Sequence, residues 1–269
     1  MEDRSLLENR VKKLLSQGQP AIGQWLVLPS PAVVELLAGY GMDWLLIDTE
    51  HGAADWETVE DMVRGMKGTD VVPIVRVAGN DPVLIKKALD RGAFGVIVPM
   101  VNTAEQARAA VAACKYPPEG IRGVAGGRAN RYGADLVQYV AEWNQQVLVI
   151  CQLETREAVQ NAESIAAVPG IDVLFIGPND LSANLNQFRQ FEHPEFTKAV
   201  DRILQAARAH RKSAGIMASA ADDTLGFVDK GFRFVSVGSD ARMLGGAAAS
   251  TYEKIRKGLN ERKISTAGS

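Results

Sequence analysis

Short runs of apolar residues recur along the chain, and longer segments with a helical period of apolar and polar positions separate them. The runs are rich in Val, Ile and Leu and mostly uncharged, as strands buried on both faces of a parallel sheet must be. We therefore predict strands within Ile22–Leu28, Trp44–Asp48, Val71–Val77, Gly95–Met100, Gln146–Leu153, Val173–Gly177, Ala214–Ala218 and Phe234–Gly238.

The segments between these runs carry start and stop signals of helices. Pro82 follows Asp81, a favourable N-cap residue, and Gly92 stands just after the expected end of that helix. Thr103 is followed three residues later by Gln106, the spacing of a capping box. The pattern predicts helices at about 4–17, Pro31–Gly39, Trp56–Met66, Pro82–Arg91, Thr103–Lys115, Leu136–Trp143, Arg156–Ala167, Pro194–Arg211, Ala220–Lys230 and about 241–260.

Eight candidate strands that alternate with helices predict an α/β fold of the (β/α)8, or TIM, barrel type, with residues 1–269 as a single domain. The alternative is an open, doubly wound sheet. It is disfavoured because Leu-Pro-Ser-Pro, and not a Gly-x-Gly-x-x-Gly motif, follows the first run. The longest connection without a helical pattern is Pro117–Asp135, and long loops in compact domains tend to carry function.

Composition narrows the class of protein further. The chain has 269 residues, of which 46% are apolar and 23% charged, and this is typical of a globular protein. A net charge of −2 argues against a nucleic-acid-binding protein. The two cysteines, Cys114 and Cys151, indicate buried thiols in a reducing compartment. The first residues lack the apolar core of a signal peptide, and no stretch has the length of a membrane span, so we expect a cytoplasmic protein that does not bind membranes.

The polar residues at the ends of the predicted strands are candidates for chemistry, because active sites of α/β barrels lie at the carboxyl ends of the strands. Glu154 and Asp180 follow two successive strands, so their carboxylates converge at the barrel mouth. Two carboxylates with room for water suit Mg²⁺ or Mn²⁺. The alternative role of both residues is structural, at the first turns of the helices that follow.

His51, Arg76 and Trp25 each have a functional and a structural interpretation. His51 lies beside acidic residues in a strand-to-loop turn and is either a general base or a loop histidine with structural partners. Arg76 is the charged residue of the run VVPIVRV, and it either faces an anion at the mouth or forms an internal ion pair with Asp48. Trp25 either lines the pocket or fills the barrel.

None of the predicted strands contains a lysine, which disfavours a Schiff-base aldolase and favours metal-assisted enolate chemistry. The chain resembles a known family, the HpcH/HpaI aldolases. These are metal-dependent class II pyruvate aldolases of the phosphoenolpyruvate/pyruvate barrel superfamily. The resemblance extends from about Gly23 to Leu244. It rests on the ordered motifs Asp48-Thr49-Glu50-His51, Val75-Arg76-Val77, Asn80-Asp81-Pro82, Leu89-Asp90-Arg91-Gly92-Ala93, Ile97-Val98-Pro99-Met100-Val101, Tyr116-Pro117-Pro118-Glu119-Gly120, Arg122-Gly123, Gln152-Leu153-Glu154-Thr155 and Gly177-Pro178-Asn179-Asp180-Leu181-Ser182.

The resemblance implies how the site binds pyruvate. Glu154 and Asp180 would hold the divalent metal, which is Mg²⁺, Mn²⁺ or Co²⁺, and pyruvate would chelate it through a carboxylate oxygen and the 2-oxo oxygen. The carboxylate of pyruvate would also accept hydrogen bonds from the backbone N–H groups of Asn179 and Asp180. Gln152 would contact the substrate. Arg76 would face the 2-oxo oxygen and stabilise the enolate.

The resemblance also assigns the groups that move and position protons. His51 would be the base, directly or through a water molecule. Asp90 would raise the basicity of His51, and Asp48 would order the network. Trp25 would lie near the aldehyde. The chain departs from the family pattern after Asp-Leu-Ser and over residues 186–193, next to the aldehyde side of the pocket, so the aldehyde is left open.

The implied activity is the reversible cleavage of a 4-hydroxy-2-oxo acid to pyruvate and an aldehyde, with decarboxylation of oxaloacetate as a side activity. The implied partners are small molecules and further copies of the chain, in a hexamer built as a trimer of dimers, and the terminal helices at about 4–17 and about 241–260 would pack in the oligomer. Two rival functions are a citrate-lyase-type lyase acting on acyl-CoA esters and a non-catalytic barrel.

Overall fold

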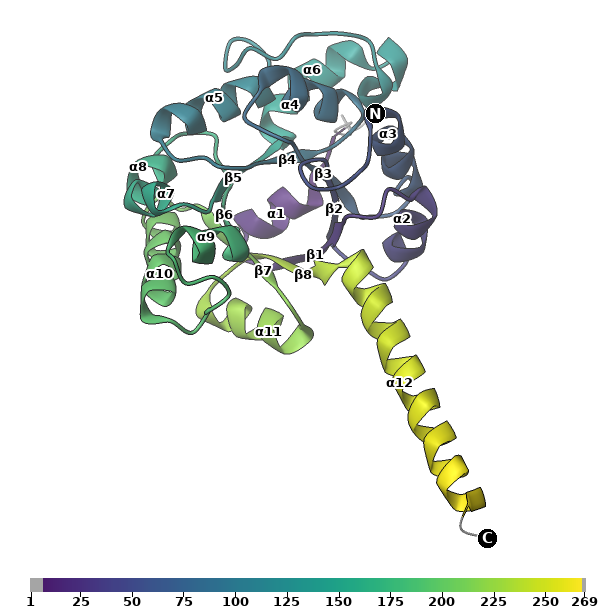
Figure 1. Ribbon diagram of the computed structural model, residues 1–269. Helices are drawn as coiled ribbons and strands as arrows, with labels where there is room; N and C mark the ends of the chain where they lie inside the picture. Colours follow the sequence, from purple (N-terminus) through teal and green to yellow (C-terminus); the bar gives the residue numbers. More distant parts are fainter. Residues whose placement is uncertain (1–6, 268–269) are drawn as a thin grey trace.

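Eight parallel strands close into a barrel in the computed structural model, which describes residues 7–267 (Figure 1). Each strand pairs with its neighbours in sequence, and β8 pairs with β1 to close the ring. The predicted (β/α)8 barrel is therefore confirmed. The strands are β1 (Ala21–Leu26), β2 (Trp44–Asp48), β3 (Val72–Arg76), β4 (Gly95–Val98), β5 (Leu148–Leu153), β6 (Val173–Ile176), β7 (Ser213–Ala218) and β8 (Phe234–Ser239).

Helices surround the barrel, and their first turns are fixed largely by side chains that the sequence pattern identifies. Asp81 accepts hydrogen bonds from the backbone of Val83 and Leu84, and Thr103 and Gln106 form both halves of a capping box. The helices are α1 (Arg10–Ser16), α2 (Pro31–Ala38), α3 (Trp56–Gly65), α4 (Pro82–Asp90), α5 (Ala104–Cys114), the 3₁₀ helix η1 (Arg128–Gly133), α6 (Leu136–Gln146), α7 (Arg156–Gln160), α8 (Ala162–Ala166), α9 (Pro178–Asn184), α10 (Pro194–Ala209), α11 (Ala221–Lys230) and α12 (Asp240–Ala267).

Three predicted helices are corrected by the structure. The helix expected at about 4–17 begins only at Arg10, because Asn9 caps it by accepting from the backbone N–H of Lys12; residues 4–6 lie outside the described residues. The single helix expected at Arg156–Ala167 is two short helices, broken at Asn161, whose backbone leaves the helical region. The last helix extends beyond the predicted end at residue 260 as far as Ala267.

The inner face of the barrel explains why polar groups gather at one end. Alternate residues of each strand point inward, and in β2 and β3 these are apolar until the last position, where Asp48 and Arg76 stand opposite each other. Gln152 occupies the corresponding inner position of β5. At the amino ends of the strands, α1 closes the barrel and places Val11 in the interior apolar cluster.

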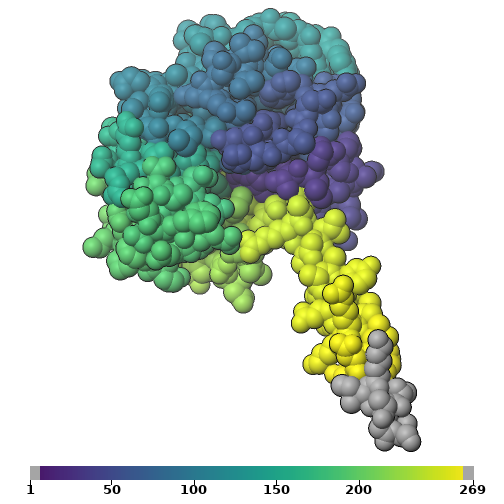
Figure 2. Space-filling model, in the orientation of Figure 1, coloured from purple at the N-terminus to yellow at the C-terminus, as the bar shows by residue number. Residues whose placement is uncertain are grey.

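Helix α12 extends away from the barrel as an arm (Figures 1 and 2). Its start is fixed, because the buried carboxylate of Asp240 accepts hydrogen bonds from the backbone of Val27 and Leu28 at 2.9 and 3.1 Å. Beyond that turn, apolar side chains such as Leu244 and Tyr252 are more than 60% exposed. Among the described residues, neither α12 nor another helix combines the length and apolar character that crossing a membrane requires.

Candidate active site

Arg76 is the central residue of the polar cluster at the carboxyl ends of β2 and β3. Its Nε lies 2.9 Å from Asp48 Oδ1, its Nη2 pairs with Asp48 Oδ2, and its Nη1 lies 2.9 Å from Glu50 Oε2. The internal ion pair with Asp48 that the sequence left as one alternative is therefore formed. A guanidinium has five N–H groups. Asp48 accepts from two of them and Glu50 forms an ion pair without a hydrogen bond, so three remain for an oxygen at the mouth.

The charge state of Asp48 follows from this pairing. Burial raises the pKa of the Asp48 carboxyl, but the hydrogen bonds and charge of Arg76, together with the backbone N–H groups of His51 and Glu50, outweigh burial and hold the pKa below its ordinary value. Asp48 is thus an ionised, buried partner of Arg76.

Trp25 fills the upper part of the barrel and also supports the ion pair. Its side chain is 2% exposed and lies 5.5 Å from the ring of Phe175. Its indole N–H donates to Asp48 Oδ2 at 3.2 Å, and the guanidinium of Arg76 lies 5.0 Å from its ring centroid. Core filling, the structural alternative for Trp25, is therefore present, and contact with an aldehyde remains a prediction.

His51 is exposed at the rim, in the loop between β2 and α3. Its backbone N–H donates to Asp48 Oδ1 at 3.3 Å, and its imidazole makes no hydrogen bond within the described part of the chain. Asp90 pairs instead with Arg122 Nη2 at 2.8 Å, and no bond joins Asp90 to His51. The imidazole is free to meet a substrate, and the role expected for Asp90 remains a prediction.

Glu154 is a buried carboxylate at the end of β5. Its Oε1 accepts a hydrogen bond from the backbone N–H of Met100 at 2.9 Å, and its Oε2 accepts one from the amide of Gln152. Burial raises the pKa of Glu154 to about 7, and the negative charges of Asp180 and Glu50 add to this effect. A helix-capping role for Glu154 is excluded, because Thr155 caps α7.

Asp180 and Asn179 lie exposed in the first turn of α9, directly after β6. The backbone N–H groups of a first helical turn have no partner inside the helix, so they are available to an anion. Asp180 caps nothing with its side chain, and its charge raises the pKa values of both Glu154 and Glu50. The two carboxylates that the sequence paired therefore follow the neighbouring strands β5 and β6 and act on each other electrostatically.

The residues at this mouth fit a hard divalent cation and an oxygen-rich ligand. Gln152 Oε1 is buried and has no hydrogen-bond partner in the described structure. A Cβ at Gly177 would collide with Glu154 Oε2 and lie 2.9 Å from Gln152 Nε2, so glycine leaves these two groups their room. Three or more His, Cys, Asp or Glu side chains do not converge anywhere in the described chain, so water and substrate oxygens would complete the coordination.

Two residues contribute to the site in ways that the sequence pattern does not indicate. Glu50 stands in the Asp-Thr-Glu-His motif, but nothing in the pattern indicates that its carboxylate turns back to Arg76. Met100 contributes its backbone N–H, and it does so from a left-handed conformation with φ of 55°. The run of β4 predicts a strand end there, but not the direction of an N–H group.

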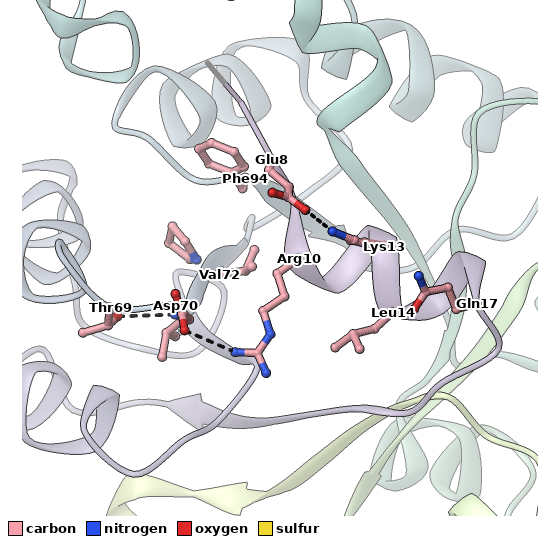
Figure 3. Close-up of a pocket in the computed structure, with 11 residues that line it drawn as sticks. Glu8, Arg10, Lys13, Leu14, Gln17, Thr69, Asp70, Val72 and Phe94 are labelled. Carbon is pink, nitrogen blue, oxygen red and sulfur yellow. Dashed lines mark hydrogen bonds and ion pairs between the residues drawn. The ribbon is translucent and has the colours of Figure 1, made fainter. Parts of the chain in front are cut away.

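A pocket beside α1 is a different feature. It encloses about 510 Å³ at the amino ends of the strands, between α1 and the start of β3 (Figure 3). Its charged side chains are paired with each other: Lys13 with Glu8, and Arg10 with Asp70 at 4.0 Å. The amino-terminal face of such a barrel is associated with stability and not with catalysis.

Comparison with known proteins places the chain in a family. The family model for HpcH/HpaI aldolase/citrate lyase matches residues 21–246. The 5-keto-4-deoxy-D-glucarate aldolase of Shigella boydii is 38% identical over 258 residues, which is 96% of this chain and 100% of the relative. The enzyme of the same name from Salmonella paratyphi C is 40% identical over 93% of this chain and 97% of its own length.

A solved structure agrees with these sequence relatives. The crystal structure of an HpcH/HpaI aldolase/citrate lyase family protein from Burkholderia cenocepacia superimposes with a TM-score of 0.89 at 35% identity, and it covers 93% of this chain and 100% of that chain. The barrel, the polar cluster at its carboxyl end and these matches together lead to one conclusion: the chain belongs to the HpcH/HpaI aldolase/citrate lyase family.

Proposed function

We propose that the protein is a metal-dependent aldolase that reversibly cleaves 4-hydroxy-2-oxo acids to pyruvate and an aldehyde through the enolate of pyruvate. The observation that carries this proposal is the charge balance at the barrel mouth. Asp48 and Glu50 pair with Arg76, whereas the buried carboxylate of Glu154 has no cationic partner in the described chain and is acted on by the negative charges of Asp180 and Glu50. Such a mouth repels a 2-oxo acid unless a cation is bound, so the site favours binding of cation and substrate together.

The cation would be held by Glu154 and Asp180, and the oxygen-only donor set favours Mg²⁺, Mn²⁺ or Co²⁺. When bound, it would act as a Lewis acid toward the 2-oxo oxygen of the substrate. The buried carboxylate of Glu154 and Gln152 Oε1, which has no hydrogen-bond partner among the described residues, support this placement.

The protein groups would divide the remaining work. The N–H groups of Arg76 that are not bonded to Asp48 would donate to the 2-oxo oxygen as it becomes negative. Gln152 would orient the substrate. His51, exposed and without a partner for its imidazole, would take the proton of the 4-hydroxyl group during cleavage.

The relatives' name supports a substrate class. A glucarate is a sugar diacid, so cleavage of its 5-keto-4-deoxy derivative to pyruvate leaves an aldehyde that still carries a carboxylate. We propose an acid-sugar substrate of this kind and a cytoplasmic location. We also propose decarboxylation of oxaloacetate as a side activity, because loss of CO₂ leaves the same enolate. A citrate-lyase-type acyl-CoA lyase is the second candidate because the family model includes citrate lyases.

Exchange at pyruvate C3 tests the proposal most directly. The protein, supplied with Mg²⁺, Mn²⁺ or Co²⁺ in D₂O and without CoA, should incorporate deuterium into the methyl group of pyruvate. A panel of aldehydes with pyruvate, read by product mass, should then give 4-hydroxy-2-oxo acids. Activity that appears only with acyl-CoA esters would favour the second candidate, and inactivity in both assays would favour a non-catalytic barrel.

Arg76→Ala is expected to slow both pyruvate C3–H exchange and aldol cleavage by about 10²–10³-fold, because the charge opposite the developing enolate is lost. It should also lower the free energy of unfolding by about 3–5 kcal/mol, since Asp48 is left buried and unpaired. Arg76→Lys should restore activity only in part, because an ammonium cannot replace the guanidinium fork. Arg156→Ala, which breaks a surface pair with Glu195, is the control and should change neither reading. Unchanged exchange in Arg76→Ala would remove Arg76 from the mechanism.

The exposed arm supports the predicted assembly. We propose a hexamer, as a trimer of dimers, in which α12 packs on a neighbouring barrel through its apolar side chains and the small residues Gly245–Ala249. Light scattering should give a mass about six times the 29.0 kDa of one chain. A chain ending at residue 242 should shift to smaller species. A stable full-length monomer at micromolar concentration would contradict this assembly.

A further inference from the structure

A second cavity lies beside the proposed active site. Most of its lining residues have no role in the proposed binding of pyruvate. It encloses about 290 Å³ and is bounded by the start of α9, the end of β7 and helices α10 and α11. Pro178 and Asn179 form part of its wall, so it borders the residues proposed to bind the carboxylate of pyruvate. Met217 also lines it and packs against the apolar cluster of the barrel interior.

Six charged side chains line this cavity, and none of them forms an ion pair in the described chain. Three are cationic and three are acidic: Arg189, Lys230, Arg242, Glu192, Asp201 and Asp223. Most other arginines of the described chain have their guanidinium bonded to a carboxylate or a carbonyl oxygen. Two guanidinium groups that line one cavity beside the proposed site, and that have no ion-pair partner in the described chain, are available to a ligand.

The two arginines come from the segments that follow strands β6 and β8. Arg242 stands in the first turn of α12, directly after β8, where Asp240 anchors the chain to β1. Arg189 lies in the connection between α9 and α10, and its backbone N–H is held by the buried hydroxyl of Ser182 at 3.0 Å. This connection lies within the segment 186–193, where the sequence departs from the family pattern.

The walls of the cavity are suited to a small polar ligand. Phe191, Phe196, Val200 and Phe227 form an apolar wall, and such walls strengthen hydrogen bonds to ionised groups by lowering the local dielectric constant. Guanidinium groups bind carboxylates, often through two parallel hydrogen bonds. The acidic groups accept hydrogen bonds from hydroxyls, and Asp223 already accepts one from Ser219 at 2.9 Å.

We propose that this cavity is the subsite for the aldehyde half of the substrate and that Arg189 and Arg242 bind a carboxylate at the distal end of that half. The aldehyde is then a hydroxylated aldehyde acid, and its hydroxyl group meets the acidic side chains. The inference rests on the proposed aldolase function and extends it, because it assigns the recognition of the acceptor to residues outside the pyruvate site.

The test compares two acceptors that differ in one group. Tartronate semialdehyde and glyceraldehyde share a hydroxyl next to the aldehyde, but the first ends in a carboxylate and the second in a CH₂OH group. The unmodified protein should favour the acid in kcat/KM for aldol addition to pyruvate. Arg189→Gln and Arg242→Gln should each lower kcat/KM for the acid on the order of 10- to 100-fold and leave that for glyceraldehyde nearly unchanged.

Two further readings separate the possible outcomes. Pyruvate C3–H exchange needs no aldehyde, so it should be the same in both variants as in the unmodified protein, and Arg108→Gln, which alters an exposed pair with Glu105, should change nothing. Normal exchange with equal loss for both aldehydes, or with no loss for the acid, would overturn the subsite. Absence of exchange in the unmodified protein would reject the aldolase proposal and the subsite with it.

Discussion

Removal of divalent cations is expected to abolish pyruvate C3–H exchange and aldol cleavage, and their return should restore both. Stabilisation of a developing negative charge by a cation is worth several kcal/mol, so the loss should be about 10³-fold or more. Glu154→Gln and Asp180→Asn should show the same loss in the presence of the metal. Both variants should keep the fold, since Asp180 is exposed and Glu154 occupies the mouth, above the apolar core.

The metal affinity should also depend on pH in a defined direction. In the cation-free protein the pKa of Glu154 is raised from 4.5 to about 7, so the folded state binds this proton more tightly than the unfolded chain does. The proton competes with the cation, and affinity should fall about tenfold per pH unit as pH drops below about 7. Without metal, the same shift makes ionised Glu154 unfavourable, so stability should decrease as pH rises from about 4.5 to about 7.

Calorimetry in buffers of different ionisation enthalpy would measure the proton released on metal binding. Glu154→Gln should remove the pH dependence, and Glu195→Gln, a surface carboxylate paired with Arg156, should leave it intact. Full activity of metal-stripped protein would rule out the proposed mechanism, and pH-independent affinity would show that Glu154 is not a ligand.

His51→Ala is expected to separate two reactions that share the enolate. Aldol cleavage should fall by about 10²–10⁴-fold, because a base is needed at the 4-hydroxyl group. Decarboxylation of oxaloacetate should fall much less, because losing CO₂ requires no such base. The structure supports a direct role, since the imidazole is exposed at the rim and only the backbone N–H of His51 is bound to Asp48.

His210→Ala is the matched control for this experiment. His210 ends α10, and its ring lies 2.7 Å from Glu163, away from the strand ends, so neither reaction should change. Equal loss of cleavage and decarboxylation in His51→Ala would mean that His51 organises the site and does not move the proton.

The sequence predicts all eight strands to within two residues at each end, because each coincides with an apolar run that is mostly uncharged and largely buried. It also predicts which polar residues reach the mouth, since the period of two places Asp48 and Arg76 on the inner face beyond Trp44 and Leu46. The paired carboxylates are predicted for the same reason: successive parallel strands deliver their ends to one place.

Other features depend on side-chain and backbone directions that the pattern does not determine. Asn161 breaks a predicted helix because its amide donates to the carbonyl of Asn102, a residue 59 positions away. The backbone N–H of Met100 reaches Glu154 only because the chain turns through a left-handed conformation. Asp90 pairs within the chain with Arg122, which is buried among aromatic rings, and the sequence pattern does not indicate this contact.

The clasp between Asp240 and the backbone of Val27 and Leu28 has a consequence for how the chain folds. The carboxylate and the amide of Val27 are 213 positions apart, so the seam between β8 and β1 closes only after nearly the whole barrel has been synthesised. Contacts of such separation form late and limit the folding rate. The hydrogen bonds of Asp240 thus form when β8 pairs with β1. The direction in which α12 extends from the barrel is therefore fixed only when the barrel closes.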